Sequence, residues 1–387
     1  AKNDSIFEIE LKFPFNAFLG ILTMKYCSVV PKDIVEFYND DFRSNPVGTG
    51  PFKFKRWEEN IKLVLRKNND YFQTDSSGIQ LPYLEAVSVT FLPEKQSEFL
   101  QLVKGKIDFI SGLDNSYKDE IINNDGSLNK YYENKINMLR GPYLNTEYLA
   151  FFMESEKNEI KSDLIRKAIN IGFDKAKMIK YLRNGVGMPA NTGFIPIGLP
   201  GHRETNLNKY NPDLAKRYVE EFKKIYNNAP SLKLTTSSNY LDFCEFIQKE
   251  LEKLGIEIII DVIPGSALKQ AKASGKLDFF RASWIADYPD AENYLSLFYS
   301  KNFAPNGPNY THFSDDDFDK IYERSLKITD PEKSKLIYSE LDSIISSKSI
   351  IVPLFYDEVV RFVSKNVKGM EINATNLLDL RKIKKVN

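Results

Sequence analysis

The sequence predicts an α/β fold, and two observations support this prediction. From about residue 145 onward, amphipathic helix patterns alternate with short apolar runs, as expected of helices that cover a buried sheet. The first hundred residues instead alternate apolar and charged side chains with period two, which is typical of antiparallel strands with one face in water. A length of 387 residues corresponds to two or three domains of about 150 residues.

The N-terminal region is predicted to be rich in strands. Residues 52–54 and 61–65 alternate apolar and charged side chains around the polar turn 58–60, as in an antiparallel hairpin. Residues 5–11 alternate in the same way, so we expect the chain to begin inside a fold. The next elements are predicted to be a strand at 87–91, a helix at 94–104 and a strand at 107–110.

The remainder of the chain is predicted to alternate between helices and buried strands. Ser162 and Asp174 can each cap a helix N-terminus, because an apolar stripe follows them. Gly255 can end the helix at 240–254 in the left-handed conformation. Further helices are predicted at 212–226, 318–328 and 331–347, a strand at 148–153, and buried strands at 256–263, 277–284 and 350–356.

Composition excludes several classes of protein. Basic and acidic side chains number 53 each, so the chain has no net field that would attract nucleic acid or an anionic membrane. Its apolar runs are shorter than the ~18 residues needed to cross a bilayer. Cys27 and Cys244 are too few for a disulfide framework and lack the spacing of a metal or redox motif, so we expect both to be small buried hydrophobes.

Templates of catalytic and metal sites are absent from the sequence. His202 and His312 lack metal-ligand spacing, and no nucleophile elbow or phosphate-binding lysine loop occurs. We expect residues 47–52, which contain two glycines, to form a tight turn into a strand. The acidic run 315–319 precedes an amphipathic helix, so its carboxylates are expected to complement the helix N-terminus and not to bind calcium. We therefore expect no cofactor and no metal.

Residues 279–290 form the most informative stretch. A buried-strand run there contains Trp284, and Arg281 and Asp287 are interleaved with aromatic side chains at its carboxyl end, where open α/β sheets bind ligands. Charges in so apolar a run are costly to bury without partners. Two interpretations stay open. Either these charges pair with each other or with neighbours to hold a loop, or they are unpaired until a ligand supplies an anionic and a cationic group.

Five blocks of sequence, in order, resemble the family 5 extracellular solute-binding proteins, the oligopeptide, dipeptide and nickel type that serves bacterial ABC importers. The blocks are Asn45 to Phe54 with Trp57 and Asn69-Asp70-Tyr71-Phe72; Leu81-Pro82-Tyr83-Leu84 with Gly105-Lys106-Ile107-Asp108; Arg166 to Asp174 with Asn184 to Ala190; Trp284 to Asp290; and Tyr310 to Asp319. Each block alone is common, but five in order over nearly the whole chain are highly specific.

The resemblance implies a two-lobed fold like that of type II periplasmic binding proteins, with lobes joined by crossing strands that close over a ligand by hinge bending. Residues 42–144 with 357–387 are expected to form an incomplete lobe one, and 145–356 to form lobe two. Residues 1–41 are expected to be a remnant of an extra domain that returns to lobe one. Family members begin earlier, so we expect the chain to be truncated at its N-terminus and to lack some ligand contacts.

Carried over residue by residue, the resemblance implies that Asp287 binds the α-ammonium group of a peptide and that Arg281 binds a peptide carboxylate. Trp284 matches a wall of the family's ligand pocket. Tyr288, Ser283 and Tyr148 complete the expected set of ligand-binding residues.

The resemblance implies a substrate-binding receptor without catalysis, which delivers short peptides to a membrane permease. An oligosaccharide, a nickel chelate or another small solute is the alternative ligand. Two alternatives belong to other classes: a glycosidase-like enzyme that uses Asp287 and Asp290, and a surface protein that only docks partners. We expect a monomer outside the cytoplasmic membrane, periplasmic or membrane-anchored as a lipoprotein, that does not bind nucleic acid.

Overall fold

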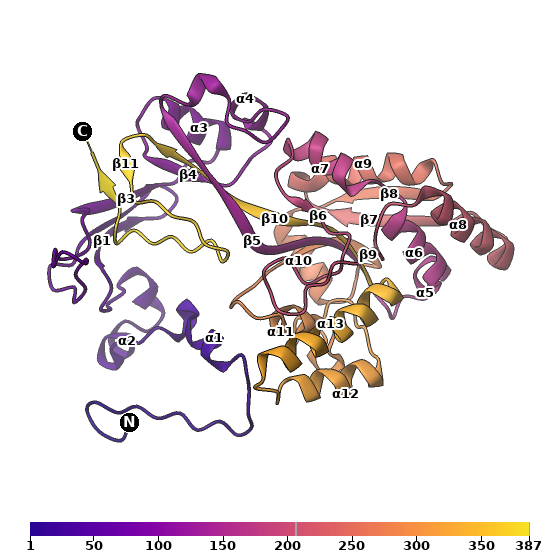
Figure 1. Cartoon of the computed structure of the whole chain (residues 1–387), viewed down its shortest axis with the longest axis horizontal. Helices are drawn as coiled ribbons and strands as arrows, with labels where there is room; N and C mark the ends of the chain where they lie inside the picture. Colours follow the sequence, from indigo (N-terminus) through magenta and orange to yellow (C-terminus); the bar gives the residue numbers. More distant parts are fainter. Residues whose placement is uncertain (206, 387) are drawn as a thin grey trace. The chain divides into compact units, whose positions relative to one another are not determined.

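The computed structural model describes residues 1–205 and 207–386 and divides into two compact units (Figure 1). Unit 1 comprises Ala1–Met24 and Leu144–Asp357, and unit 2 comprises Lys25–Tyr143 and Glu358–Asn387. Two long strands, β5 (Ile136–Phe151) and β10 (Ile351–Ser364), each contain residues of both units. The expected lobe boundaries, and the assignment of residues 1–41 to a remnant, stay predictions.

Unit 2 contains a three-stranded antiparallel sheet. Strand β1 (Phe52–Glu58) pairs with β2 (Lys62–Lys67), which pairs with β3 (Ala86–Thr90). The predicted hairpin is therefore confirmed. This unit also contains α2 (Lys32–Tyr38), α3 (Lys95–Val103), β4 (Phe109–Ser111), α4 (Lys118–Ile121), β11 (Val367–Lys368) and β12 (Lys384–Lys385). Strand β4 pairs antiparallel with the second half of β10.

Unit 1 contains a mixed sheet with the order β10-β5-β9-β7-β8. Strand β9 (Phe279–Ile285) is antiparallel to β5, whereas β7 (Ser231–Thr236) is parallel to both β9 and β8 (Glu257–Val262). The short strand β6 (Met188–Pro189) pairs with β10. The helices are α1 (Phe18–Leu22), α5 (Asn158–Lys161), α6 (Asp163–Ile171), α7 (Lys175–Arg183), α8 (Pro212–Tyr226), α9 (Leu241–Glu252), α10 (Gly265–Ala273), α11 (Glu292–Leu295), α12 (Asp316–Ser325) and α13 (Pro331–Lys348).

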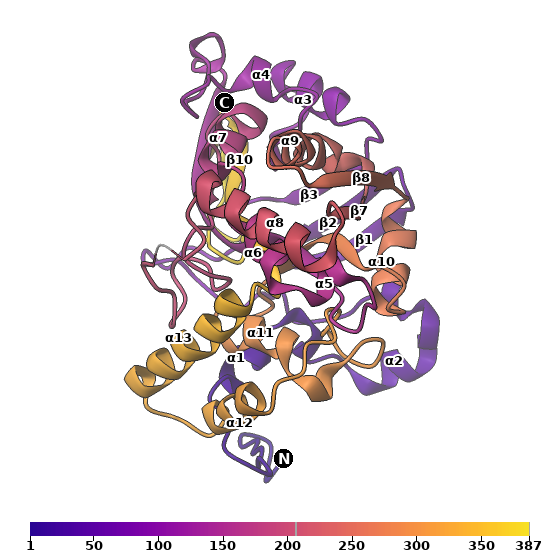
Figure 2. The same cartoon turned by 90° about the vertical axis from the view of Figure 1, so that its right-hand side faces the viewer.

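The main core of unit 1 lies between its sheet and helices α6 to α9. Ile165 of α6, Phe222 of α8 and Ile247 of α9 are fully buried there against Phe279 of β9. These helices form because their apolar residues recur every three or four positions, which gives each helix one stripe to bury. Helices α11, α12 and α13 lie together as a separate group (Figures 1 and 2).

Local signals in the sequence predicted several helix ends correctly. The Asp174 carboxylate accepts hydrogen bonds from the backbone N–H groups of Ala176 and Lys177, as expected of an N-cap. Asp315 caps α12 in the same way, which confirms that the acidic run complements a helix N-terminus. Gly255 follows α9 with a φ of +79°, in the left-handed region.

Two local predictions were wrong. Residues 5–11 form no strand, because no neighbouring strand pairs with them and their period-two pattern has no sheet to join. Cys27 is exposed, whereas Cys244 is buried as expected, because only the latter lies on the apolar stripe of a core helix.

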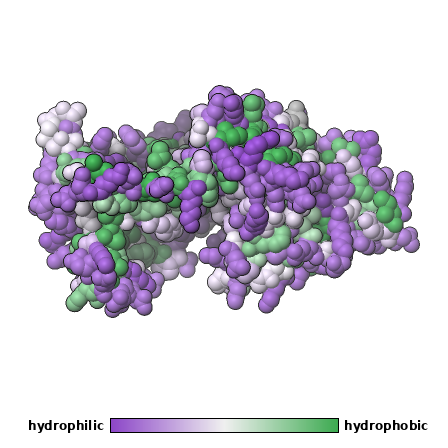
Figure 3. Space-filling view, turned by 90° about the horizontal axis from the view of Figure 1, so that it is seen from below, coloured by the Kyte–Doolittle hydropathy of each residue, from purple (hydrophilic) through white to green (hydrophobic). Residues whose placement is uncertain are grey.

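No helix in the part of the chain that the structure describes is long and apolar enough to span a bilayer. Hydrophilic side chains cover most of the face shown in Figure 3, with smaller hydrophobic patches between them.

Candidate ligand-binding site

The pairing of β5 with β9 divides the expected site residues between the two faces of the sheet in unit 1. Ser283 lies opposite Glu147, and Trp284 lies opposite Thr146. Opposite residues of an antiparallel ladder share a face, and successive side chains alternate between faces. Arg281 and Ser283 therefore share one face with Glu147, whereas Trp284 and Tyr148 occupy the other.

Asp287 lies in the turn that follows β9, and its side chain is exposed. Its carboxylate has no hydrogen-bond or ion-pair partner among residues 1–205 and 207–386. An accessible carboxylate with unused acceptor oxygens can bind an ammonium group through charge-assisted hydrogen bonds.

Asn293 of α11 holds this turn in place. Its side-chain oxygen accepts the indole N–H of Trp284 at 2.6 Å and the backbone N–H of Asp287 at 3.3 Å. The hydroxyl of the neighbouring Tyr294 donates to the carbonyl of Leu144 at 2.7 Å, and the backbone N–H of Ala286 donates to the same carbonyl at 2.8 Å. The turn is thus fastened both to α11 and to β5.

Tyr288 follows Asp287 in the same turn, and its side chain is buried. Its hydroxyl donates to the carboxylate of Glu292, which also accepts the hydroxyl of Tyr322 from α12. Burial raises the pKa of Glu292, and the two tyrosine hydroxyls oppose this rise. The contacts of Tyr288 are therefore internal, and its expected contact with a ligand stays a prediction.

Arg281 is already paired within the protein. The interpretation in which its charge stays unpaired until a ligand binds therefore does not hold for this residue. Its Nη2 forms an ion pair with Glu147 of β5, and the exposed fractions of the two side chains are 12% and 4%. The guanidinium carbon lies 3.2 Å from the ring centroid of Tyr240, a cation–π contact. The other interpretation, pairing with a neighbour, holds for Arg281, although the partner is Glu147 and not Asp287.

Within unit 1, the ion pair continues into a longer polar network that involves the interiors of β5 and β10. The Asn145 amide donates to Glu147 at 3.1 Å and to Asp357 at 3.4 Å. Asp357 also accepts from Arg183 at the end of α7. Oppositely charged and polar groups therefore alternate across β9, β5, β10 and α7, and each charge in this run has a partner.

Tyr148 is buried in this structure, and its expected contact with a ligand stays a prediction. It is 4% exposed, and its ring packs edge-on against Phe194 at a centroid distance of 5.0 Å. Burial raises its pKa. The loop that carries Phe194 covers this face of the sheet.

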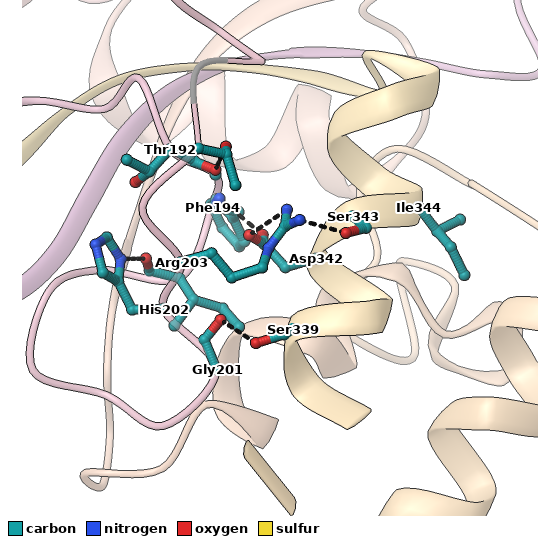
Figure 4. A network of polar contacts seen from close by, with 12 residues as sticks. Thr192, Phe194, Gly201, His202, Arg203, Ser339, Asp342, Ser343 and Ile344 are labelled. Carbon is teal, nitrogen blue, oxygen red and sulfur yellow. Dashed lines mark hydrogen bonds and ion pairs between the residues drawn. The ribbon is translucent and has the colours of Figure 1, made fainter. Parts of the chain in front are cut away.

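A buried polar network fastens that loop to α13 (Figure 4). The Asp342 carboxylate accepts the backbone N–H of Phe194 at 2.8 Å, and Arg203 reaches both Asp342 and the Ser343 hydroxyl. The Ser339 hydroxyl donates to the carbonyl of Gly201 at 3.0 Å. These contacts keep the loop against the Tyr148 face of the sheet.

Each unit has a hollow of its own, and neither hollow is lined by any of the expected site residues. One of about 730 Å³ in unit 1 is bordered by Arg166, His312 and Lys348. Its charges are already engaged, since Arg166 donates to backbone carbonyls and Lys348 pairs with Asp315. The other, of about 1330 Å³ in unit 2, is bordered by β3 and by residues 377–385.

A sequence profile of the bacterial extracellular solute-binding proteins, family 5, matches residues 1–306. The chain belongs to this family.

Relatives of this solute-binding protein resemble it over nearly its whole length. The glutathione-binding protein GsiB of Salmonella paratyphi A is 25% identical over 374 residues, which cover 94% of this chain and 69% of the relative. The probable D,D-dipeptide-binding periplasmic protein DdpA of Escherichia coli K12 is 26% identical over 381 residues, covering 96% and 70%. The structure of DppA from Helicobacter pylori in complex with the peptide STSA matches with a TM-score of 0.81 and 24% identity, covering 97% and 72%. The expected fold of type II periplasmic binding proteins is therefore confirmed.

The sequence did not indicate several residues that hold the candidate site in place. Asn293, Glu147 and Tyr240 were not singled out, because their roles depend on strand pairing and helix packing. Asp290, the second acid of the glycosidase alternative, is half-buried, and it accepts the backbone N–H of Glu292 at 2.8 Å. Burial raises the pKa of Asp290. In residues 1–205 and 207–386, no group of three or more His, Cys, Asp or Glu side chains is arranged to hold a metal ion.

Proposed function

We propose that this protein is the substrate-binding receptor of an ABC importer and that Asp287 binds the α-ammonium group of a short peptide. The observation that carries the proposal is the exposed carboxylate of Asp287, which has no partner among the described residues and lies in a turn held by Asn293. A ligand ammonium would supply the missing charge partner.

The relatives support peptides as the class of ligand. Glutathione, which the name of GsiB gives as its ligand, is itself a small peptide with a free amino group. The name of DdpA gives D,D-dipeptides as its probable ligands. Trp284 fits the role of a pocket wall, because its half-buried ring is fixed by the hydrogen bond from its indole N–H to Asn293.

We propose a receptor and not an enzyme. The Asp290 carboxylate already accepts a backbone N–H of its own turn, which argues against its use as the second carboxylate of an acid and base pair with Asp287. The proposed partner is a permease in the membrane, and the proposed location is outside the cytoplasmic membrane, in the periplasm or at a lipid anchor. The protein is proposed to act as a monomer.

Calorimetry with matched peptides tests the role of Asp287. Short peptides are titrated in two forms, with a free amino terminus and with an acetylated one. The wild type is expected to bind the free form more tightly, and Asp287→Asn is expected to weaken it by about 2 kcal/mol or more, on the order of 30-fold. Asp316→Asn is the matched control, because Asp316 is an exposed aspartate of the same unit at α12.

Equal affinity of wild type and Asp287→Asn for the free peptides would remove Asp287 from the site. Mass spectrometry of ligand retained after expression provides an independent check on the class of ligand. Recovery of an oligosaccharide or a metal chelate in place of a peptide would overturn the peptide proposal while leaving the receptor role intact.

A further inference from the structure

Two carboxylates lie next to each other where the Asp287 turn leads into α11. Asp290 accepts the backbone N–H of Glu292 at 2.8 Å, and its charge acts directly on the Glu292 carboxylate. Glu292 is 5% exposed, whereas Asp290 is half-buried. In the described part of the chain, neither carboxylate forms an ion pair with a lysine, arginine or histidine. Two negative charges in this position repel each other where little water screens them.

Three tyrosines supply the side-chain hydrogen-bond donors to this pair. Tyr288 of the turn and Tyr322 of α12 donate to Glu292. Tyr338 of α13 donates to Asp290. Burial raises the pKa of all three hydroxyls, so they remain neutral donors. The pair is therefore surrounded by hydroxyl groups from three elements, and these hydroxyls carry no charge that would offset the two carboxylates.

These surroundings favour a proton on the pair. Burial raises the pKa of both Asp290 and Glu292, and the charge of Asp290 raises the pKa of Glu292 further. The hydroxyl donors oppose these rises without reversing them. Helix α1 meets the Tyr288 ring at Gly20, which brings no charged side chain to the cluster. One shared proton removes the repulsion while every hydrogen bond to the pair is kept.

Loss of this proton would move Asp290, because Glu292 is enclosed and Asp290 can turn toward water. A carboxylate of Asp290 that turns away releases the backbone N–H of Glu292 and the hydroxyl of Tyr338. The backbone N–H of Asp290 donates to the carbonyl of Tyr288 at 2.8 Å, within the turn that carries Asp287. Movement of Asp290 therefore loosens the turn that presents the proposed ammonium anchor.

We propose that Asp290 and Glu292 together hold one proton and that its loss loosens the turn that carries Asp287, so that the receptor binds peptides less tightly as the pH rises. The two acids act through this turn, so they are positioning residues. By linkage, a bound peptide in turn favours retention of the proton. The inference rests on the proposed function, because it takes Asp287 to be the anchor for the ligand.

Calorimetry with the tripeptide Ala-Ala-Ala at several pH values between about 5 and about 7 tests the inference. This range lies above the ordinary pKa values of the two carboxyl groups, 3.8 and 4.5, and below the ~8 of a peptide α-ammonium group. The dissociation constant of the wild type is expected to rise about threefold or more across the range. It should rise by no more than about tenfold per pH unit, because one proton is linked to binding.

Neutral variants of similar shape isolate the pair, because every other titrating side chain is common to them and to the wild type. Asp290→Asn and Glu292→Gln each leave one carboxylate, so both are expected to keep the affinity that the wild type has near pH 5 across the whole range. The double variant is expected to match either single variant, since removing one charge already abolishes the repulsion. Glu332→Gln, at an exposed position of α13, is expected to follow the wild type.

A dissociation constant of the wild type that does not rise between pH 5 and pH 7 overturns the inference, and this measurement does not depend on the folding of any variant. A constant affinity ratio between wild type and folded Asp290→Asn overturns it as well, because a purely structural role changes affinity equally at every pH. If no peptide binds at any pH, the proposed function fails and the inference with it. Peptide binding without the expected pH dependence overturns the inference alone.

Discussion

Trp284 donates its indole N–H to the side-chain oxygen of Asn293 at 2.6 Å, although nine positions separate the two residues along the chain. The same oxygen accepts the backbone N–H of Asp287 at 3.3 Å. One buried amide, 4% exposed, therefore fixes both the proposed pocket wall and the turn that presents the proposed ammonium anchor. The position of the Asp287 backbone therefore depends on the buried side chain of Asn293.

Replacement of Asn293 is expected to impair binding through Asp287. Asn293→Ala leaves two donors without an acceptor, so we expect a loss of stability of about 1–3 kcal/mol and weaker binding of peptides with a free amino group. Asn293→Asp keeps an acceptor oxygen and is expected to retain most of the affinity. The measurement is the affinity ratio between free and N-acetylated peptides, which a purely structural defect would leave unchanged. A wild-type ratio in Asn293→Ala would exclude the positioning role.

Gly193 is expected to tolerate no side chain, because the Asp342 carboxylate occupies the space beside it. A Cβ atom at position 193 would lie 1.9 Å from Oδ2 of Asp342. Gly193→Ala must displace this carboxylate from the Phe194 N–H, so we expect a loss of about 1–3 kcal/mol in the free energy of unfolding. Gly265→Ala is the control, since nothing lies within 4 Å of its Cβ position. Equal denaturant midpoints for the two variants would contradict the prediction.

Local patterns predicted the elements of the fold well but did not predict its long-range pairings. Helix α8 has the predicted bounds, and the caps at Asp174 and Asp315 follow from neighbouring residues alone. The Glu147–Arg281 ion pair joins residues 134 positions apart and depends on the register of β5 against β9. Periodicity in one segment carries no information about the register of another.

The same limit explains the outcome for the candidate site. Asp287 could be selected because it follows a buried strand, and its exposure is compatible with the proposed role. The burial of Tyr148 could not be predicted, because it comes from a loop that contains Phe194, far along the chain. No sequence pattern indicated Asn293, because an asparagine after a turn is common. Only the two N–H groups that donate to its side-chain oxygen distinguish it, and these contacts depend on the fold.

Lys175 is expected to make stability depend on pH in the alkaline range. Its ammonium group is buried and donates to the Asn170 side chain and to the carbonyls of Ala190 and Asn208 at 3.2 to 3.3 Å. Burial lowers its pKa from 10.5 to about 7. Between these values the unfolded chain binds more protons than the folded protein, so the free energy of unfolding rises with pH across this range and is reduced as the pH falls toward 7.

Urea unfolding at several pH values between about 7 and about 10 checks this prediction. The stability of the wild type relative to Lys175→Met is expected to rise with pH, by at most about 1.4 kcal/mol per pH unit. Lys224→Met removes an exposed lysine of α8 and should leave the slope of the wild type unchanged. The difference between wild type and Lys175→Met isolates this one group, because every other titrating side chain is common to both proteins. If that difference stays constant across the range, Lys175 keeps its ordinary pKa, and the three oxygens around it compensate fully for its burial.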